Sequence, residues 1–392
     1  MIKKIFVLLV LLCTTFTLNA NSLSKEIVEK VKEATVFILM ESPNNESVVN
    51  NNGRGTCSGF VINDKGYIVT NYHCVHNATQ LKLAFYDLDD WNLYEVKIIG
   101  IDPLGDIAVI HIPKRKKSLP FLKWSEEEPW DGMDVFAVGH PFGMSWSITK
   151  GVVSHSKRTF RSPYVRYLQS DAAINSGNSG GPLVNTAGNV VGVNSMIINP
   201  SRVQPKTNIG LGLALRNDDA KEIVDNLVSG KEHIRPIVGV SLVDINPLNR
   251  ETMTQMDDVK EAGITIPNTF GSLIAPTEGM PEGLEKFDTI VGIDGEAVNR
   301  QDDLTDVIRN KKVGDTINLL IIRDRVFKNV TVTLKKLKVT GSQLFDKKGN
   351  LQIPEAPKVP KTPEEDPKIN EKPNDETQKP EEPKDPDNEA AK

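Results

Sequence analysis

The sequence predicts a mainly β protein with two globular domains and a polar tail. From Cys57 to Ile198, short apolar runs alternate with turn residues and long helical periodicity is absent, which is typical of an all-β sandwich or barrel. Asn217–Val228 is the clearest helix, because it has a polar start, apolar residues at helical spacing and Gly230 as its end. A chain of 392 residues is long enough for about two domains, each with a core of its own.

Met1–Ala20 has the pattern of a secretory signal peptide. Lys3 and Lys4 precede the apolar run Ile5–Leu12, and a polar stretch ends at Leu18–Ala20. The apolar run is short for a membrane span, which needs about 20 residues, although an uncleaved anchor remains the alternative. We therefore expect an exported protein, periplasmic or secreted, that associates with a membrane only through an uncleaved N-terminus.

Residues 21–36 are expected to form an N-terminal helix. Ser22 and Ser24 are suitable capping residues, and apolar side chains at positions 23, 27, 28, 31 and 34 share one helical face. Thr35–Met40 then begins the first strand. The following stretch Glu41–Gly55 is rich in Asn, Ser and Gly, which predicts a surface loop.

Asn175–Pro182 is a glycine-rich turn with one hydroxyl group, that of Ser179, at its tip. A catalytic serine needs an adjacent base and donors for the developing oxyanion. Glycines on both sides allow positive φ and let backbone N–H groups turn inward. By itself the turn is equally compatible with a plain tight loop, since Gly, Asn, Ser and Pro dominate turns.

Two further residues favour catalysis. His73 ends the apolar run that starts at Gly66, and Asp106 begins a second apolar run. A histidine can act as the base while an aspartate fixes its tautomer. The order His73, Asp106, Ser179 is chymotrypsin-like and differs from the orders in subtilisin and the α/β-hydrolases. The strand–turn–strand pattern after the serine, over residues 183–193, also argues against a hydrolase elbow, which joins a strand to a helix.

Several stretches resemble the HtrA family of serine proteases (DegP, DegQ and DegS), over most of residues 35–340. They are Cys57–Ile62, Thr70–His73, Asp106–Val109, Gly139–Gly143, Thr149–Ser154, Ser170–Leu183 and Gly210–Ala214. The resemblance implies a protease domain over residues 37–230, built as a chymotrypsin-like double β-barrel. The two barrels have six strands each, and the site lies in the cleft between them. It also implies a homotrimer or a multiple of it, with the N-terminal helix either at that contact or packed on its own barrel.

The resemblance also places the residues around the serine. The oxyanion hole is expected at Gly177, Asn178 and Ser179, with the N–H groups of Gly177 and Ser179 as donors and Asn178 as a turn residue. Trypsin-like enzymes carry a carboxylate six residues before the serine, whereas this chain has Ala173 there. An uncharged pocket favours small or medium apolar substrate side chains. The substrate-binding residues are expected to be Ile174, Gly192, Val193, Asn194, Leu211 and Leu213, with Gly192–Ser195 pairing with the substrate strand.

Cys57 and Cys74 are the two cysteines left after removal of the signal peptide, which would take Cys13 with it. An even pair in an exported protein indicates a disulfide. Trypsin-like enzymes have a similar bridge beside the catalytic histidine, whereas HtrA proteases usually lack it. The alternative is a pair of free buried thiols.

Residues 236–340 resemble a PDZ domain. Ile237, Val238, Gly239 and Val240 lie in the place of the loop that receives a peptide C-terminus, and the bound peptide would add a strand to the sheet edge. Two departures from the PDZ pattern leave an alternative interpretation, in which the domain is a module that only packs or gates. The stretch Asn246–Asn268 is longer and more polar than the pattern requires, and Phe287-Asp288 replaces the usual Gly-Asp turn.

Residues 345–392 are expected to be disordered, because Pro, Lys, Glu and Asp dominate them and cannot bury enough apolar surface. Lys114–Lys117 reads as a solvated turn, and Trp124, Trp130 and Trp146 are expected to pack in the core or cleft. The net charge of −5 gives no basic surface for nucleic acid. The scattered histidines predict neither a metal site nor another cofactor.

The leading hypothesis is an ATP-independent serine endoprotease that degrades unfolded or damaged exported polypeptides. The triad would be His73, Asp106 and Ser179. A chaperone or peptide-binding scaffold with minor proteolysis is the alternative from another class. A regulatory protease with one membrane-bound target is a third possibility.

Overall fold

The computed structural model describes residues 22–41, 53–86, 92–112, 119–144, 146–160, 162–199, 208–261, 263, 265–275 and 279–337. The expected signal peptide, the Lys114–Lys117 turn, the C-terminal tail and most of the Glu41–Gly55 loop lie outside these residues. Within them, no helix is both long and apolar enough to cross a bilayer.

The first helix, α2 (Lys25–Ala34), lies within the residues 21–36 that were expected to be helical but is shorter at both ends, and β1 starts at Thr35. Its cap is Ser24, whose hydroxyl oxygen accepts a hydrogen bond from the N–H of Ile27 at 3.2 Å, which satisfies one of the unpaired donors at the helix start. Val31 and Ala34 are fully buried in the core of the same domain. The apolar face therefore packs on its own barrel.

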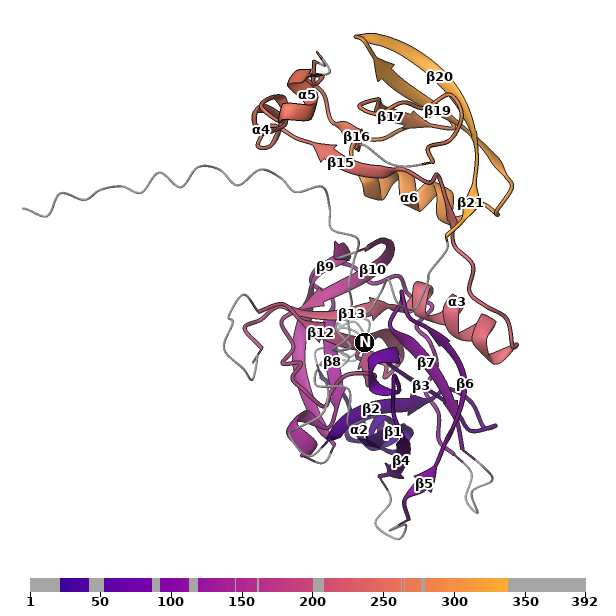
Figure 1. The fold of residues 1–392 in the computed structure, drawn as a ribbon. Helices are drawn as coiled ribbons and strands as arrows, with labels where there is room; N and C mark the ends of the chain where they lie inside the picture. Colours follow the sequence, from indigo (N-terminus) through magenta and orange to yellow (C-terminus); the bar gives the residue numbers. More distant parts are fainter. Residues whose placement is uncertain are drawn as a thin grey trace, which may run out of the picture. The chain divides into compact units, whose positions relative to one another are not determined.

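The first half of the protease-like region is a seven-stranded antiparallel sheet with the strand order β5-β4-β1-β2-β3-β7-β6 (Figure 1). The resemblance implied six strands, and the additional one is the two-residue β5. The strands are β1 (Thr35–Glu41), β2 (Arg54–Val61), β3 (Tyr67–Thr70), β4 (Gln80–Phe85), β5 (Tyr94–Glu95), β6 (Lys97–Asp102) and β7 (Ile107–His111).

The second half is a closed six-stranded barrel with the order β10-β13-β12-β11-β8-β9, as the resemblance implied. Its strands are β8 (Asp134–Gly139), β9 (Ser147–Phe160), β10 (Ser162–Ser170), β11 (Pro182–Val184), β12 (Val190–Ile197) and β13 (Gly212–Arg216). One apolar cluster joins side chains of both halves, including Phe60 and Val109 from the first and Val138 and Val193 from the second. This shared core fixes the two halves against each other.

The tryptophans only partly follow the prediction. Trp124 packs edge-on against Phe60 with ring centroids 5.7 Å apart. The indole N–H of Trp146 donates to the carbonyl of Thr35 at 2.9 Å. Trp130 is 53% exposed, so the expectation of burial is wrong there. Its indole N–H reaches the carboxylate of Glu127 at the surface.

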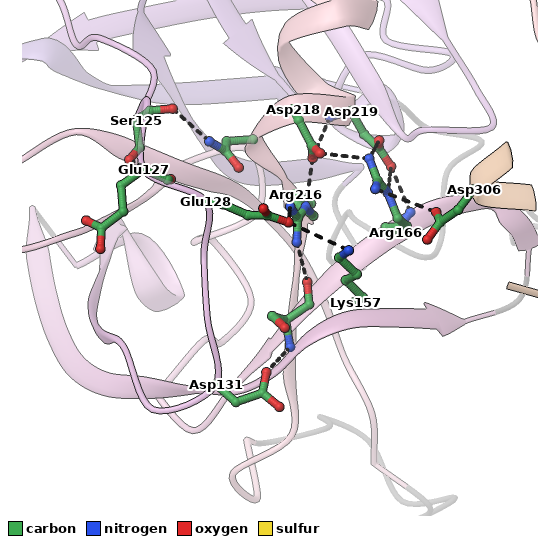
Figure 2. A network of polar contacts seen from close by, with 12 residues as sticks. Ser125, Glu127, Glu128, Asp131, Lys157, Arg166, Arg216, Asp218, Asp219 and Asp306 are labelled. Atoms are coloured by element: carbon green, nitrogen blue, oxygen red, sulfur yellow. Dashed lines mark hydrogen bonds and ion pairs between the residues drawn. The ribbon is translucent and has the colours of Figure 1, made fainter. Parts of the chain in front are cut away.

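Helix α3 (Asn217–Val228) has the predicted limits and packs on both halves of the region. Its N-cap position holds Arg216, which gives no side-chain cap. Instead, Arg166 of β10 pairs with Asp218 and Asp219 of the first turn at 2.7 and 2.6 Å, and Arg216 pairs with Asp218 and Glu128 at 2.9 and 2.7 Å (Figure 2). The acidic residues also complement the positive end of the helix dipole. These ion pairs replace the missing cap.

The region from residue 236 onward forms a separate antiparallel sheet with the order β15-β16-β17-β19-β20, and β18 pairs with β17. A short two-stranded sheet, β14 with β21, joins its ends. The elements are β14 (Pro236–Ile237), β15 (Ser241–Ile245), α4 (Arg250–Thr254), α5 (Asp257–Glu261), β16 (Gly271–Ala275), β17 (Thr289–Ile293), β18 (Glu296–Ala297), α6 (Gln301–Arg309), β19 (Thr316–Arg323), β20 (Val326–Thr333) and β21 (Lys335–Lys336).

Phe287 explains both departures of this domain from the expected pattern. It has a φ of 71°, in the left-handed region that a glycine would enter without strain. Its ring is 7% exposed and packs with Met253 and Val259 in a small apolar cluster of its own. Met253 and Val259 belong to α4 and α5, the two short helices inside the long stretch 246–268. The extra segment and the unusual phenylalanine therefore form one packing unit.

Candidate active site

Ser179 lies in the turn between β10 and β11, at a point where the backbone is crowded. Gly177 and Gly180 have φ angles of 103° and 83°. A Cβ on Gly180 would lie 2.3 Å from the carbonyl oxygen of Ser58, and one on Gly177 would lie 2.1 Å from that of His140. Only glycine fits these two positions, which accounts for the glycine pattern around the serine.

His73 and Asp106 are brought together by the ends of two neighbouring strands. His73 lies in the 3-10 turn η1 (Tyr72–Cys74) that follows β3, and Asp106 lies directly before β7, the partner of β3. The His73 Nδ1 atom is 2.8 Å from Oδ2 of Asp106, and the backbone N–H of His73 donates to Oδ1 at 3.0 Å. Asp106 has a φ of 54°, a strained value of the kind found at functional sites. This geometry fixes the imidazole ring with its Nδ1–H toward the carboxylate.

Ser195 connects the serine to the other two residues. The hydroxyl of Ser179 donates to the carbonyl of Ser195 at 3.2 Å, and the hydroxyl of Ser195 donates to Oδ2 of Asp106 at 2.7 Å. Ser195 thus contacts Ser179 through its carbonyl and Asp106 through its hydroxyl, which places the serine beside the His73–Asp106 pair without forming a continuous proton relay. Sequence reasoning missed this role of Ser195, and no local motif marks it.

The pKa of His73 is raised above its ordinary value. Burial acts to lower this pKa by disfavouring the imidazolium, but the negative charge of Asp106 and its hydrogen bond outweigh burial. The side chain is 24% exposed. A base whose pKa is raised and whose side chain is partly exposed suits proton transfer from a serine hydroxyl.

The three N–H groups of the expected oxyanion hole differ in whether they already have a hydrogen-bond partner. The N–H of Asn178 donates to the carbonyl of Asn175 at 3.0 Å, so Asn178 is a turn residue and not an oxyanion donor. Among the hydrogen bonds of the described residues, none uses the N–H of Gly177 or Ser179. The Asn175 side chain in turn accepts from the N–H of Asn208 at 3.0 Å, so it braces the turn from outside.

The expected substrate strand needs a correction. Val193 pairs with Pro182 of β11 on one side and with Leu215 of β13 on the other. The backbone N–H and carbonyl of Asn194 are bonded to the main chain of residues 180 and 181. Gly192 also pairs on both sides, so residues 192–194 offer no free edge. Because β11 begins at Pro182, residues 195–197 of β12 extend past it, and these present the open edge.

The other expected substrate-binding residues, Ile174, Leu211 and Leu213, are all apolar and carry no charge. Ile174 and Leu213 are 1% and 0% exposed, and Leu211 is partly exposed. A Cβ on Gly212 would lie 2.9 Å from Cδ1 of Ile174, so the isoleucine side chain already fills the space beside that strand. Ala173, in the position of the trypsin-like carboxylate, is exposed.

Comparisons with known proteins agree with this geometry. The family model of the trypsin-like peptidase domain matches residues 57–193, and that of the PDZ domain matches residues 236–334. The serine protease Do-like HtrA of Bacillus subtilis (strain 168) is 31% identical over 334 residues, which cover 79% of this chain and 72% of that protein. The chain belongs to the HtrA family.

Other HtrA relatives are longer. The probable periplasmic serine endoprotease DegP-like of Chlamydia muridarum is 34% identical over 72% of this chain but only 54% of its own length. The chain thus spans about half the length of this relative and of the similarly named protein of Brucella suis (55%). Among solved structures, the HtrA-type protease AlgW with tripeptide has a TM-score of 0.64 at 24% identity, covering 81% of this chain and 98% of that one. The serine endoprotease from Yersinia pestis has a TM-score of 0.56 at 25% identity, over 80% and 97%.

A disulfide joins Cys57 and Cys74 of this HtrA-family chain, and Cys74 directly follows His73. Both residues are buried, and Sγ of Cys74 lies 3.8 Å from the carbonyl of Ser179. The bridge therefore joins β2 to the turn that carries His73, and this turn lies next to the turn that carries Ser179. Cys57, His73 and Cys74 bring potential ligand atoms within 4.8 Å of one another. Because the two sulfurs are bonded to each other, neither is a thiolate, and this group is not a metal site.

The sequence predicts peptide binding at residues 237–240 of the PDZ domain. Ile237 ends β14 and residues 238–240 lead to β15, with Gly239 at a φ of 90° and the side chain of Val238 buried. Among the strands that the structure describes, β15 pairs with β16 alone. Within that part of the chain, the strand that follows the loop is an edge strand, as the addition of a peptide strand would require.

Proposed function

We propose that this chain is an ATP-independent serine endoprotease that hydrolyses unfolded or damaged polypeptides. The observation that carries the proposal is the cluster of Ser179, Ser195, Asp106 and His73, in which Ser195 bonds both Ser179 and Asp106 and Asp106 bonds His73. It lies beside a turn in which two N–H groups have no partner among the described residues. Membership of the HtrA family supports the same conclusion.

In the proposed reaction, the hydroxyl of Ser179 attacks the scissile carbonyl and His73 takes its proton at Nε2. Asp106 holds the Nδ1–H tautomer and stabilises the imidazolium that forms. The N–H groups of Gly177 and Ser179 receive the negative charge of the tetrahedral intermediate. His73 then protonates the leaving amine, and water releases the acyl group by the reverse sequence.

The substrates are extended segments cut after small or medium apolar side chains. Ala173 leaves no carboxylate for a basic residue, and Ile174 fills space beside Gly212. A substrate strand would pair with the open edge at residues 195–197, which reads the backbone more than the sequence. Folded proteins rarely offer such a strand, so unfolded chains are favoured. Strict cleavage after Lys or Arg would contradict this specificity.

The PDZ domain receives peptide C-termini or regulates the protease through the loop 237–240 and the edge strand β15. The enzyme works after export, in the periplasm, because residues 1–20 have a secretory pattern and several relatives are named periplasmic endoproteases. It assembles as a homotrimer or a multiple of it. Light scattering after size exclusion tests the assembly, and a monomeric mass would contradict it.

The function is tested by fluorophosphonate labelling and casein cleavage, with Ser179→Ala as the inactive variant. We expect the wild type to be labelled and to cleave unfolded casein, and Ser179→Ala to do neither. Full casein cleavage by Ser179→Ala would refute the assignment. Wild-type protein that is folded but neither labelled nor active would instead support a chaperone or peptide-binding scaffold. Labelling without casein cleavage would indicate a regulatory protease with a narrow target.

A further inference from the structure

The two peptide groups of the oxyanion turn are held from outside by residues that the triad does not include. The carbonyl of Ser176 accepts from the N–H of Phe142 at 2.7 Å. Because the peptide is trans, this bond points the N–H of Gly177 the opposite way. The carbonyl of Gly177 accepts from the hydroxyl of Ser58 at 2.7 Å. The orientation of the turn therefore depends on Ser58 and on the segment that follows β8.

Ser58 is bonded on all sides, which determines where its proton lies. A serine hydroxyl has one proton and two lone pairs. The proton goes to the carbonyl of Gly177. The oxygen then accepts from the backbone N–H of His140 at 3.1 Å, and its remaining contact is with Nδ1 of His140 at 2.9 Å. All three contacts are satisfied together only if His140 carries its proton on Nδ1, an assignment that follows from the network.

The ring of His140 is neutral and enclosed. It is fully buried, and burial lowers its pKa to about 3. The rings of Phe37 and Trp146 meet it edge-on, with centroids 5.1 and 4.6 Å away. Within the described structure, Nε2 has no hydrogen-bond partner, which suits an unprotonated acceptor better than a buried donor. The imidazole can therefore do little except direct its Nδ1–H at Ser58.

We propose that Ser58 and His140 are a positioning pair that holds the peptide group between Gly177 and Asn178. Together with the bond from the N–H of Phe142 to the carbonyl of Ser176, this keeps Gly177 placed with its N–H directed into the hole. Ser58 comes from β2 of the first half and His140 from the end of β8 in the second, so the pair also joins the two halves behind the turn. Ser58 contacts the nucleophile residue as well, since its N–H donates to the carbonyl of Ser179 at 2.8 Å. This inference rests on the proposed protease function and concerns transition-state stabilisation, not substrate binding.

The pair predicts a defined kinetic pattern. Ser58→Ala leaves the carbonyl of Gly177 and both donors of His140 without these partners, so the peptide group between Gly177 and Asn178 loses this restraint. We expect kcat to fall about 10- to 100-fold, less than the loss from removing an oxyanion donor outright, while KM for a small peptide changes less than about threefold. His140→Leu should behave in the same way. His140→Asn should recover activity to within about threefold of wild type, because its amide nitrogen is as many bonds from Cβ as Nδ1 is.

The test measures kcat and KM with a fluorogenic peptide, together with the affinity for a peptide boronic acid that forms a tetrahedral adduct with Ser179. If the pair positions the turn, boronate affinity falls in proportion to kcat in Ser58→Ala and His140→Leu and recovers in His140→Asn. Ser125→Ala is the matched control. Ser125 is a buried serine of the same domain whose hydroxyl donates to the carbonyl of Glu127, and its variant should keep both values.

Two outcomes would contradict the proposed positioning role of Ser58 and His140. One is a rise in KM with kcat and boronate affinity unchanged in Ser58→Ala. The other is an equal loss in His140→Leu and His140→Asn. If Ser58→Ala does not fold, the two His140 variants decide the question by themselves. Failure of the proposed function is recognised separately, because the wild type would then be inactive or Ser179→Ala would stay active.

Discussion

Replacing His140 by Asn should make the protease domain less sensitive to acid. Within the described residues, the His140 ring contacts the Ser58 hydroxyl and the rings of Phe37 and Trp146, none of which carries charge. Burial lowers the pKa of His140 to about 3, against about 6.5 in an unfolded chain. Below pH 6.5 the His140 imidazole therefore binds a proton in the unfolded state but stays neutral in the folded state. The free energy of unfolding decreases as the pH falls from 6.5 toward 3. Between pH 8 and pH 5 this one group costs about 2 kcal/mol of unfolding free energy.

The assay is urea unfolding at pH 8 and at pH 5, with both proteins carrying Ser179→Ala to prevent self-digestion. The four tryptophans all lie between residues 91 and 146, so their fluorescence reports on the protease domain and not on the PDZ domain. The other histidines are the same in both proteins and cancel in the comparison. We expect the pH-dependent loss to be about 2 kcal/mol smaller with His140→Asn than with His140. An equal loss in the two proteins would show that the imidazole is not held neutral by burial.

Three further predictions test other parts of the structure. Asp106→Asn should lower kcat about 10⁴-fold. Because Asp106 raises the pKa of His73, the acid limb of the pH profile of kcat/KM should also move from above pH 6.5 to lower pH. An unmoved limb would exclude His73 as the titrating base. Replacing Cys57 and Cys74 together by Ser should cost about 3 kcal/mol of unfolding free energy, because a bridge over 17 residues no longer restricts the unfolded chain; an unchanged urea midpoint would argue against the bridge. Phe287→Ala should cost about 3 kcal/mol and expose the amides of α4 and α5 to hydrogen exchange, whereas protection equal to wild type would show that these helices do not depend on the ring.

The sequence identifies the residues with local signatures and misses those that act through distant contacts. Helix α3 could be predicted because its polar start, apolar spacing and terminal glycine lie within fourteen residues of chain, Asn217–Gly230. His73, Asp106 and Ser179 stand at strand ends or turns in a recognisable order. Ser195, by contrast, follows an ordinary strand pattern, and its role exists only because β12 passes beside Asp106.

Strand edges are hidden from the sequence for a related reason. The residues 192–194 look like any β-strand, and whether they have a free edge depends on where β11 begins. Ser58 and His140 are 82 residues apart and belong to different halves of the domain. Their contact depends on how the two halves pack. Trp130, which the sequence predicts to pack in the core or cleft, instead lies at the surface, where a carboxylate accepts a hydrogen bond from its N–H.

The ion pairs at the start of α3 limit how this enzyme can be recombined with its homologues. The helix has no cap of its own, and its first turn is neutralised by guanidinium groups of Arg166 on β10 and Arg216 on β13. A hybrid that takes its barrels from one parent and this helix from another would bring in Asp218 and Asp219 without their counter-ions, and the nearly buried Asp219 would be the more costly of the two. A crossover after Val228 inherits helix and strands as a single block, but exchanging the PDZ domain there also removes Arg309 of α6, whose guanidinium pairs with Asp219 at 2.6 Å.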